Sequence, residues 1–541
     1  MTNGYLSIIL HAHLPFVRHP EKRELAEDWL YEAITESYIP LLKIINHLYN
    51  EDIDFKLTIN LSPTLTQMLN DELIQEKYQR HLQKLIELSE KEIERTKEHQ
   101  QLNKLAWMYN HLFKEAFNIF HEKYNNNLLK GFKEIQEKGK VEIITSAATH
   151  GYLPLMFTDE SKNAQIKAGI NSYQNIFDKE PEGIWLPECG FKPDLDPILS
   201  QNNIRYFITS THGILFADPR PRYGVYAPVY TPEGVAAFGR DYESSKQVWS
   251  ADEGYPGDYN YREFYRDIGY DLNYDYIKDY LPGGVRKQIG IKYHKITGKT
   301  ENKELYNPEQ AREKAAEHAG NFMFNRQQQV SHLNQIMDRK PIIVAPYDAE
   351  LFGHWWFEGP QWLEFLFKKL HYDQNDIETI TPAQYLKKYP KNQISMPSES
   401  SWGYKGYHEV WLNGSNDWIY RHLHEAELKM IELTETNLDL EDRNNLKYRA
   451  LNQMARELLL AQSSDWAFIL KTDTMVDYAE KRTKNHLNNF FKLADQIEND
   501  DINQKFLLDL EQKNNIFQDI NFKFYQKINT ESSSRARFAY M

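Results

Sequence analysis

The stretch PIIVAPYDAELFGHWWFEGPQW, residues 341–362, carries evidence of both a fold and a chemistry. It begins with a short apolar run that predicts a buried strand, and the strand delivers two carboxylates, Asp348 and Glu350. His354 and Trp355 follow directly. Acids at the carboxyl end of a buried strand, beside flat aromatic rings, are suited to chemistry on sugars. The alternative interpretation is that these acids only cap the following helix.

A second segment, GIWLPECGFKP at 183–193, also runs from an apolar stretch into a carboxylate, Glu188. Two acids from distant strands could meet at one end of a barrel. A retaining glycosidase needs such a pair roughly 5–5.5 Å apart, one as nucleophile and one as acid/base. Cys189 as a nucleophile is a competing hypothesis. It is disfavoured because no thiol-activating signature surrounds this cysteine and a free Cys is usually a small buried apolar residue.

Composition narrows the classes of protein that this chain can belong to. At 541 residues, two or three structural units are expected. The net charge of −14, without a long basic run, argues against a nucleic-acid partner. A single Cys indicates a reducing compartment. The N-terminal sequence lacks the features of a signal peptide, and no run of apolar residues is long enough for a transmembrane helix. A soluble, cytoplasmic protein is therefore expected.

Aromatic residues are unusually numerous, with 35 Tyr, 27 Phe and 11 Trp. The Trp-rich clusters near 355–362 and 402–418 favour a groove that stacks sugar rings. Trp402, between Ser and Gly, is typical of a platform in a loop, whereas Trp411 is equally explained by core packing.

Short apolar runs alternate with helical patterns, which is typical of a parallel α/β barrel. The expected strands are Leu6–Leu10, Phe55–Ile59, Val141–Ile144, Gly183–Leu186, Tyr206–Ile208 and Ile342–Ala345.

Three segments depart from this alternation. Residues 72–137 are charged, almost free of Gly and Pro, and carry Leu and Ile at helical spacing, which predicts an inserted helical subdomain rather than a coiled coil. Residues 217–300 are rich in Pro, Gly and Tyr, which favours an active-site loop. The chain beyond about 400 is mostly helical in pattern. The expected domains are a catalytic barrel at 1–400 containing the insertion at 72–137, a C-terminal helical domain at 401–528 and a flexible tail at 529–541.

Several polar residues outside the two acids are candidates for the site. His11 and His13 share one face of a strand because side chains alternate, and His150 could join them as a third metal ligand. Contact with sugar hydroxyls is the favoured interpretation, because no carboxylate or Cys ligand is closely spaced with them. Asp465 could bind a sugar or only cap a helix. Arg262 could line the groove or form an ion pair.

Five ordered motifs resemble glycoside hydrolase family 57, and within it the 1,4-α-glucan branching enzymes. The motifs are HAHLPFVRHPE at 11–21, EIITSAATHGYLP at 142–154, GIWLPECGF at 183–191, PYDAELFGHWWFEGP at 346–360 and ARELLLAQSSDWAF at 455–468.

The resemblance implies an incomplete (β/α)7 barrel with an inserted helical subdomain and a C-terminal all-helical domain. It implies that Glu188 is the catalytic nucleophile and Asp348 the general acid/base. The remaining predicted substrate-binding residues are His11, His13, His150, Trp185, Arg262, His354, Trp355, Trp402, Trp411 and Asp465. The family also has a mobile loop with a Tyr at its tip, for which Tyr230 and Tyr242 are the candidates.

The activity implied is cleavage of α-1,4 linkages and transfer of the chain to a 6-hydroxyl, by a retaining double displacement. No cofactor or metal is expected, the partner is an α-1,4-glucan, and the protein is expected to be a monomer or weak homo-oligomer. The alternatives are an α-amylase or 4-α-glucanotransferase on the same acids, a metallohydrolase or deacetylase built on the histidines, and a non-catalytic glucan-binding protein.

Overall fold

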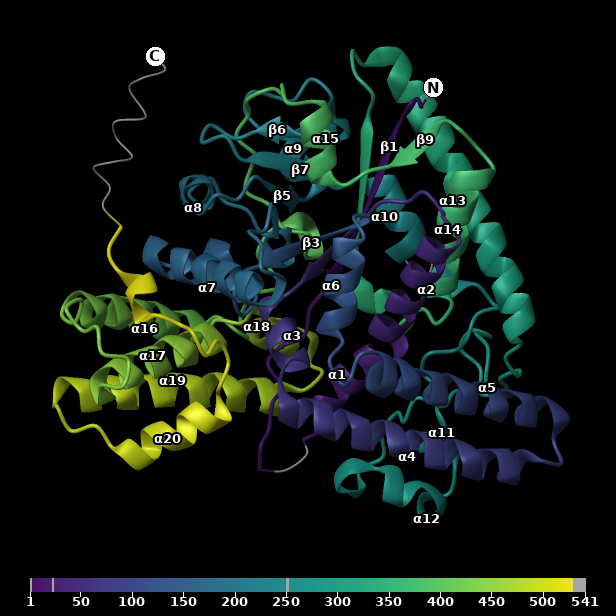
Figure 1. The fold of residues 1–541 in the computed structure, drawn as a ribbon, viewed down its shortest axis with the longest axis horizontal. Helices are drawn as coiled ribbons and strands as arrows, with labels where there is room; N and C mark the ends of the chain where they lie inside the picture. Colours follow the sequence, from purple (N-terminus) through teal and green to yellow (C-terminus); the bar gives the residue numbers. More distant parts are fainter. Residues whose placement is uncertain (1, 22–23, 250–252, 529–541) are drawn as a thin grey trace. The chain divides into compact units, whose positions relative to one another are not determined.

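The computed structural model describes residues 2–21, 24–249 and 253–528, which fall into two compact units. The first unit comprises Met1–Ile59, Met68–Glu142 and Asp241–Thr381, and the second comprises Asn60–Gln67, Ile143–Arg240 and Pro382–Met541. Each unit has its own group of parallel strands covered by helices (Figure 1). No helix within the described ranges has the length and apolar character needed to cross a membrane.

The sheet of the first unit is centred on β1 (Gly4–Ala12), all of whose residues are buried. β1 pairs in parallel with β8 (Ile342–Asp348), from Tyr5 opposite Ile342 to His11 opposite Asp348. Its first residues also pair in parallel with β9 (Ile377–Thr379). Because residues opposite one another in neighbouring strands share a face of the sheet, this register puts the His11 and Asp348 side chains on the same face.

The helices of the first unit include a long antiparallel pair, α4 and α5 (Figure 1). The Asp71 carboxylate caps α4 by accepting a hydrogen bond from the Ile74 N–H. Buried Glu92 on α4 accepts hydrogen bonds from the hydroxyls of Tyr276 and Tyr293 at 2.8 and 2.9 Å, which ties part of the Tyr-rich segment to this helix. The helices are α1 (Glu27–Ala33), α2 (Ile39–Asn50), α4 (Glu72–Thr96), α5 (Gln100–Phe117), α6 (Leu129–Glu137), α10 (Tyr242–Trp249), α11 (Ile268–Asp271), α12 (Tyr274–Ile277), α13 (Pro308–Ile336) and α14 (Gly359–Tyr372).

One turn of π-helix, Ile34–Tyr38, connects α1 to α2 without a break in the chain's helical course. All of its residues are buried, including the polar residues Glu36 and Tyr38. Single π turns inside α-helices are rare and are frequent at functional sites. The Glu36 and Tyr38 side chains contact residues that follow β8, as described below.

The second unit contains five strands in the order β6-β7-β5-β4-β3. All neighbours are parallel except β6 and β7. The strands are β3 (Val141–Ser146), β4 (Gly183–Trp185), β5 (Tyr206–Thr209), β6 (Val229–Tyr230) and β7 (Ala236–Gly239). A buried aliphatic and aromatic cluster, which includes Ile184, Phe207 and Leu199, packs these strands against the neighbouring helices.

The second unit also contains the C-terminal helices. α17 and α19 pack together around a buried hydrogen bond in which His486 Nδ1 lies 2.7 Å from Glu457. The same carboxylate accepts hydrogen bonds from Gln453 and Asn514 at 2.9 and 2.7 Å, so its charge is fully surrounded by donors. The helices are α7 (Asp159–Phe177), α8 (Leu195–Gln201), α9 (Thr211–Leu215), α15 (Pro382–Lys388), α16 (Trp418–Glu435), α17 (Leu446–Ala461), α18 (Ser464–Thr472), α19 (Val476–Glu498) and α20 (Gln504–Lys513).

All six strands expected from the sequence are present, the sixth being β2 (Leu57–Leu61). The segment at 72–137 is helical over most of its length, as expected. The segment at 217–300 is more structured than expected, since it contains β6, β7 and α10. The domain boundary near residue 400 stays a prediction, because the compact units divide the chain elsewhere. The expected flexible tail at 529–541 lies outside the described residues.

Candidate active site

The end of β8 gathers polar side chains in the first unit. Asp348 is the last residue of the strand, opposite His11. Two residues further along β1's course, the His13 N–H donates to Glu350 Oε1 at 3.2 Å. The His11 and His13 rings lie 5.9 Å apart with 20° between their planes, as expected for residues on one face of an extended chain. The two predicted histidines therefore accompany Asp348 within this unit.

Glu350 has an unusual electrostatic environment for a carboxylate. The Tyr38 hydroxyl, from the π turn, donates a hydrogen bond to the same Oε1 atom that accepts from the His13 N–H. Burial raises the pKa of Glu350 from its ordinary value to about 7, although these hydrogen bonds act in the opposite direction. The Tyr38 pKa is raised in turn, by burial and then by the neighbouring carboxylates of Glu350 and Asp348. Glu350 is thus able to exchange a proton near neutral pH.

Glu36, also in the π turn, lies in a buried cationic environment. His354 Nδ1 is 2.9 Å from Glu36 Oε2, and an Arg262 guanidinium nitrogen is 3.8 Å from the same oxygen. Burial disfavours the charged carboxylate, but His354, Arg262 and Lys292 outweigh it and lower the pKa of Glu36 to about 2. The glutamate is therefore ionised, and it fixes the orientation of His354.

Trp355 is an exposed aromatic residue, with 54% of its surface accessible. Its ring stacks on Phe264 at 4.4 Å, and the Lys292 ammonium lies 4.0 Å from the Phe264 ring centre. The Arg262 guanidinium packs on Phe357 at 4.1 Å, and its side chain is only 1% exposed. The Trp355 ring is therefore accessible to solvent, whereas the Arg262 side chain is buried.

Glu188, in the second unit, follows β4 in a strained backbone conformation. Its φ of 61° is in the left-handed region, and Cys189 and His150 also have positive φ, at 51° and 56°. Such conformations cost free energy in residues with a side chain, and they cluster at functional sites. The Trp402 indole N–H donates to Glu188 Oε2 at 2.7 Å, and the Trp402 backbone N–H donates to the Glu188 carbonyl at 3.0 Å. The carboxylate is aimed by these contacts.

The second oxygen of Glu188 contacts the start of α18. The Ser464 hydroxyl lies 3.1 Å from Glu188 Oε1 and 2.9 Å from His150 Nδ1. His150 Nδ1 itself is 3.7 Å from Oε1. Asp465, the predicted sugar contact, accepts a hydrogen bond from the neighbouring Ser463 hydroxyl.

The tryptophans of this unit differ in exposure. Trp185 and Trp411 are buried, whereas Trp402 is partly exposed and meets Trp185 edge-on at 5.0 Å. Trp411 stacks on Tyr152 at 4.3 Å. The Tyr152 hydroxyl hydrogen-bonds to His408 at 2.8 Å. This contact ties Tyr152 to the loop that carries Trp402.

Comparison with known proteins agrees with these observations. The profile of glycosyl hydrolase family 57 matches residues 7–329, and the profile of the 1,4-alpha-glucan branching enzyme C-terminal region matches residues 422–525. The chain belongs to glycosyl hydrolase family 57. Its fold is the incomplete (β/α)7 barrel of the family, with inserted helices and a C-terminal helical domain, as the sequence predicted.

The proteins that this chain is similar to carry more than one activity in their names. A 1,4-alpha-glucan branching enzyme of Thermococcus kodakarensis is 33% identical, over 96% of this chain and 78% of the relative. The crystal structure of a branching enzyme from Pyrococcus horikoshii has a TM-score of 0.87 and 32% identity, covering 98% of each chain. The structure of an alpha-amylase from Thermotoga maritima has a TM-score of 0.91 and 48% identity, covering 97% of this chain and 99% of that one.

The two candidates for the family's loop tyrosine occupy different elements. Tyr230 lies in β6, and its backbone bonds to Gln393 and Ser395 at 2.9 and 2.8 Å. Tyr242 begins α10 and is 63% exposed. Tyr265 in the same Tyr-rich segment is more exposed, at 74%.

A metal site was the alternative role for the histidines. Within residues 2–21, 24–249 and 253–528, no group of three or more His, Cys, Asp or Glu side chains has an arrangement that could hold a metal ion.

Several polar residues that lie near Glu350 and His354 or near Glu188 were not singled out from the sequence. These are Glu36, Tyr38, Lys292 and Ser464. Glu36 and Tyr38 lie in a helical pattern where an acid and a tyrosine are ordinary. The only available signal for Ser464 was its position beside Asp465, in a motif of the family resemblance.

Proposed function

We propose that this protein is a 1,4-α-glucan branching enzyme, in which Glu188 is the nucleophile and Asp348 the general acid/base. The observation that carries the proposal is the environment of Glu188. A carboxylate in a strained backbone position, with an indole N–H on one oxygen and a hydroxyl on the other, is oriented for attack. The branching-enzyme profile over 422–525 supports the choice of reaction.

The reaction proceeds in two displacements with net retention. Glu188 attacks the anomeric carbon of an α-1,4 linkage while Asp348 gives its proton to the departing oxygen, which leaves a covalent glucosyl ester and a free 4-hydroxyl. Asp348, now a carboxylate, then takes the proton from the 6-hydroxyl of an acceptor glucan as that oxygen displaces Glu188. The product is an α-1,6 branch, and both side chains regain their initial protonation states.

Water competes with the acceptor hydroxyl in the second displacement. Exposed aromatic rings bind the apolar faces of glucose units, and Trp355 on Phe264 and the partly exposed Trp402 are suited to this role. A glucan held by such rings occupies space that water would otherwise fill, which favours transfer over hydrolysis. His11, His13 and His150 act as hydrogen-bonding partners of the sugar hydroxyls or of the carboxylates.

An α-amylase is the second candidate, because the solved structure with 48% identity is described as one. The two activities share both displacements and differ only in whether a sugar hydroxyl or water resolves the ester.

The deciding experiment is analysis of linkages and reducing ends after incubation with amylose. New α-1,6 linkages with few new reducing ends are expected. Reducing ends without α-1,6 linkages would overturn branching and favour the amylase. Glu188→Gln and Asp348→Asn are expected to abolish turnover, whereas Glu301→Gln, at a fully exposed acid, is the matched control. Full turnover by Glu188→Gln would reject the nucleophile.

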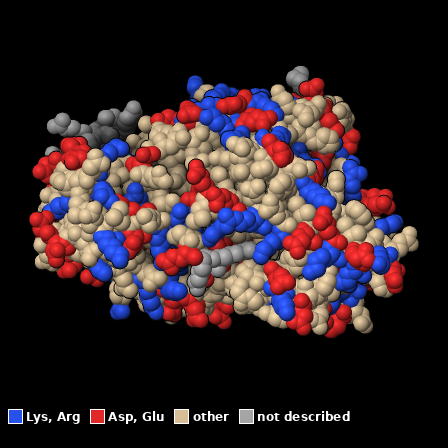
Figure 2. Space-filling view, turned by 60° about the horizontal axis from the view of Figure 1, so that its bottom comes forward, with Lys and Arg blue, Asp and Glu red and all other residues tan. Residues whose placement is uncertain are grey.

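The cellular setting is part of the same proposal. We expect a cytoplasmic protein that acts on α-1,4-glucan chains as a monomer or weak homo-oligomer. Nucleic acid is not expected as a partner, and on the face that Figure 2 shows, Lys and Arg side chains are interspersed with Asp and Glu rather than gathered in one basic strip.

A further inference from the structure

The start of α18, inside the region matched by the C-terminal branching-enzyme profile, contacts the nucleophile candidate directly. We propose that Ser464 is a positioning residue of the reaction, which holds the Glu188 carboxylate and connects it to His150. The C-terminal helical region thereby contributes a side chain to the proposed active site. This inference rests on the proposed role of Glu188.

The hydrogen-bond directions follow from the number of protons available. The Ser464 hydroxyl has one proton, and the Glu188 carboxylate in its ionised form can only accept. The hydroxyl therefore donates to Glu188 Oε1 at 3.1 Å, and it accepts the Nδ1 proton of His150 at 2.9 Å. Because His150 Nδ1 is 3.7 Å from Oε1, beyond ordinary hydrogen-bond length, Ser464 is the connecting group between the two.

The two oxygens of Glu188 are held from different segments of the chain. Trp402 holds Oε2 and Ser464 holds Oε1. Since the backbone of Glu188 is strained, with φ at 61°, these side-chain contacts decide where the carboxylate points. Loss of either contact removes one hydrogen bond from the carboxylate and leaves the other in place.

Ser464 is itself fixed by contacts with the segment that carries His150. Its N–H donates to the His150 carbonyl at 3.1 Å. Two residues earlier, the Gln462 amide donates to the Ser161 hydroxyl at 2.7 Å. Buried Glu427 on α16 accepts hydrogen bonds from the N–H groups of Phe157 and Thr158 at 3.0 and 2.9 Å.

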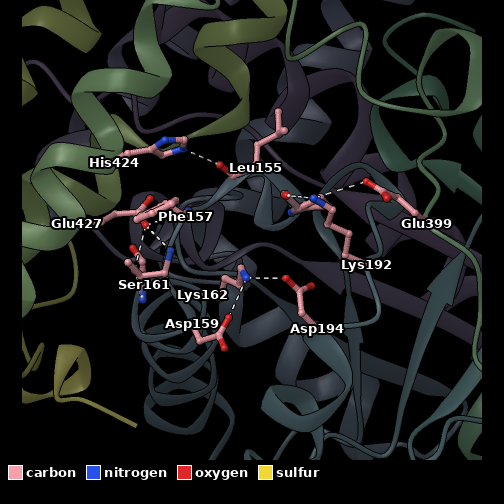
Figure 3. A network of polar contacts seen from close by, with 12 residues as sticks. Leu155, Phe157, Asp159, Ser161, Lys162, Lys192, Asp194, Glu399, His424 and Glu427 are labelled. Atoms are coloured by element: carbon pink, nitrogen blue, oxygen red, sulfur yellow. Dashed lines mark hydrogen bonds and ion pairs between the residues drawn. The ribbon is translucent and has the colours of Figure 1, made fainter.

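Figure 3 shows this junction, with Glu427 directed at the backbone near Phe157 and His424 directed at the carbonyl of Leu155. The His424 contact measures 3.0 Å. The C-terminal helices are thus joined to the segment that follows β3 by several independent hydrogen bonds. This attachment holds the Ser464 hydroxyl at a fixed place against Glu188.

The contact acts at both displacements. When Glu188 forms its bond to the anomeric carbon, the carboxylate gives up its charge and the Ser464 hydrogen bond weakens. When the 6-hydroxyl displaces Glu188, the carboxylate charge returns and the hydrogen bond strengthens again. A donor that favours the charged carboxylate therefore helps its departure in the second displacement, and loss of this donor slows release of the glucosyl ester.

The experiment compares Ser464→Thr with Ser464→Val, which have nearly the same shape and differ in the hydroxyl. We expect Ser464→Thr to retain kcat within about threefold, and Ser464→Val and Ser464→Ala to lose about 10- to 100-fold, the effect of one hydrogen bond to a charged group. The KM for amylose should stay constant or fall, because the ester accumulates. Ser172→Ala is the matched control, since this buried hydroxyl only accepts a 3.0 Å hydrogen bond from Gln67.

Each outcome has a definite meaning. Equal kcat for the Thr and Val variants, or a rise in KM with unchanged kcat, would overturn the positioning role. Should Ser464→Ala fail to fold, the Thr and Val pair still isolates the hydroxyl. If Glu188→Gln retains turnover, the nucleophile assignment fails; if Glu188→Gln is inactive while Ser464→Val is fully active, only this inference fails.

Discussion

Replacement of Glu350 by Gln tests the electrostatic account of the β8 terminus. Glu350 Oε1 accepts hydrogen bonds from the Tyr38 hydroxyl and the His13 N–H. The amide oxygen of Gln can accept both, so Glu350→Gln removes the charge and keeps the geometry. Any change in stability with pH can then be assigned to ionisation of this carboxyl.

The magnitude and sign of the expected change in unfolding free energy follow from the raised pKa of Glu350. Its pKa of about 7 in the folded protein lies above the ordinary value of 4.5, so ionisation destabilises the folded state. This loss of unfolding free energy is absent below about pH 4.5 and grows as the pH rises from 4.5 to about 7. It reaches its full value above about pH 7. The full shift corresponds to about 3 kcal/mol at 1.36 kcal/mol per unit. Because Glu350 keeps some contact with solvent, we expect about 1–2 kcal/mol.

Urea unfolding of the wild type and the variant at pH 5 and pH 8 measures this effect. We expect Glu350→Gln to exceed the wild type in unfolding free energy by about 1–2 kcal/mol at pH 8, and by under about 0.5 kcal/mol at pH 5. Glu301→Gln, whose side chain is 101% exposed, should show no such pH dependence. A variant that is less stable than the wild type at pH 8, or a difference independent of pH, would refute the reasoning.

Three further results are expected. Trp402→Phe keeps a ring and removes the 2.7 Å hydrogen bond to Glu188, so kcat on amylose should fall about 10- to 100-fold, and an unchanged kcat would contradict the role of this donor. Gly353→Ala would place a Cβ 1.7 Å from the Glu36 carbonyl oxygen at a φ of 111°, so thermal unfolding should show a loss of about 3 kcal/mol or more in unfolding free energy. In the control Gly414→Ala, the added Cβ meets nothing within 4 Å, and the unfolding free energy should stay within about 0.5 kcal/mol of the wild type. Prolonged chelation should leave turnover unchanged, and a loss that Zn²⁺ restores would revive the metallohydrolase alternative.

The sequence was most informative where local pattern and structure coincide. The apolar run before Asp348 predicted a strand, and alternation along residues 11–13 predicted that both histidines share a face. Their association with Asp348 then required the β1–β8 register, which pairs His11 with Asp348 at the carboxyl ends of the two parallel strands. β7 was not predicted, because three of the four residues of its sequence AAFG are Ala or Gly, which are depleted in strands.

The parts of the site that sequence could not reveal depend on contacts between distant segments. Glu36 and His354 are 318 residues apart, and neither residue's local pattern indicates the other. At the start of α18, Ser464 and Asp465 are adjacent and both polar. Which of them contacts Glu188 depends on the rotation of the helix, which neighbouring residues of a motif do not specify.

The contacts made by the π turn at Ile34–Tyr38 depend on the number of residues in that turn. A π turn accommodates one more residue than an α-helical turn in the same axial span. Deletion of a single residue there would let ordinary α-helical hydrogen bonds close and would remove the bulge, while the helical segments on either side keep their register. The side chains of the turn would then be redirected, and the hydrogen bonds of Glu36 with His354 and of Tyr38 with Glu350 would be lost in one step. A frame-preserving three-base deletion that leaves the helix itself intact is therefore expected to damage these contacts.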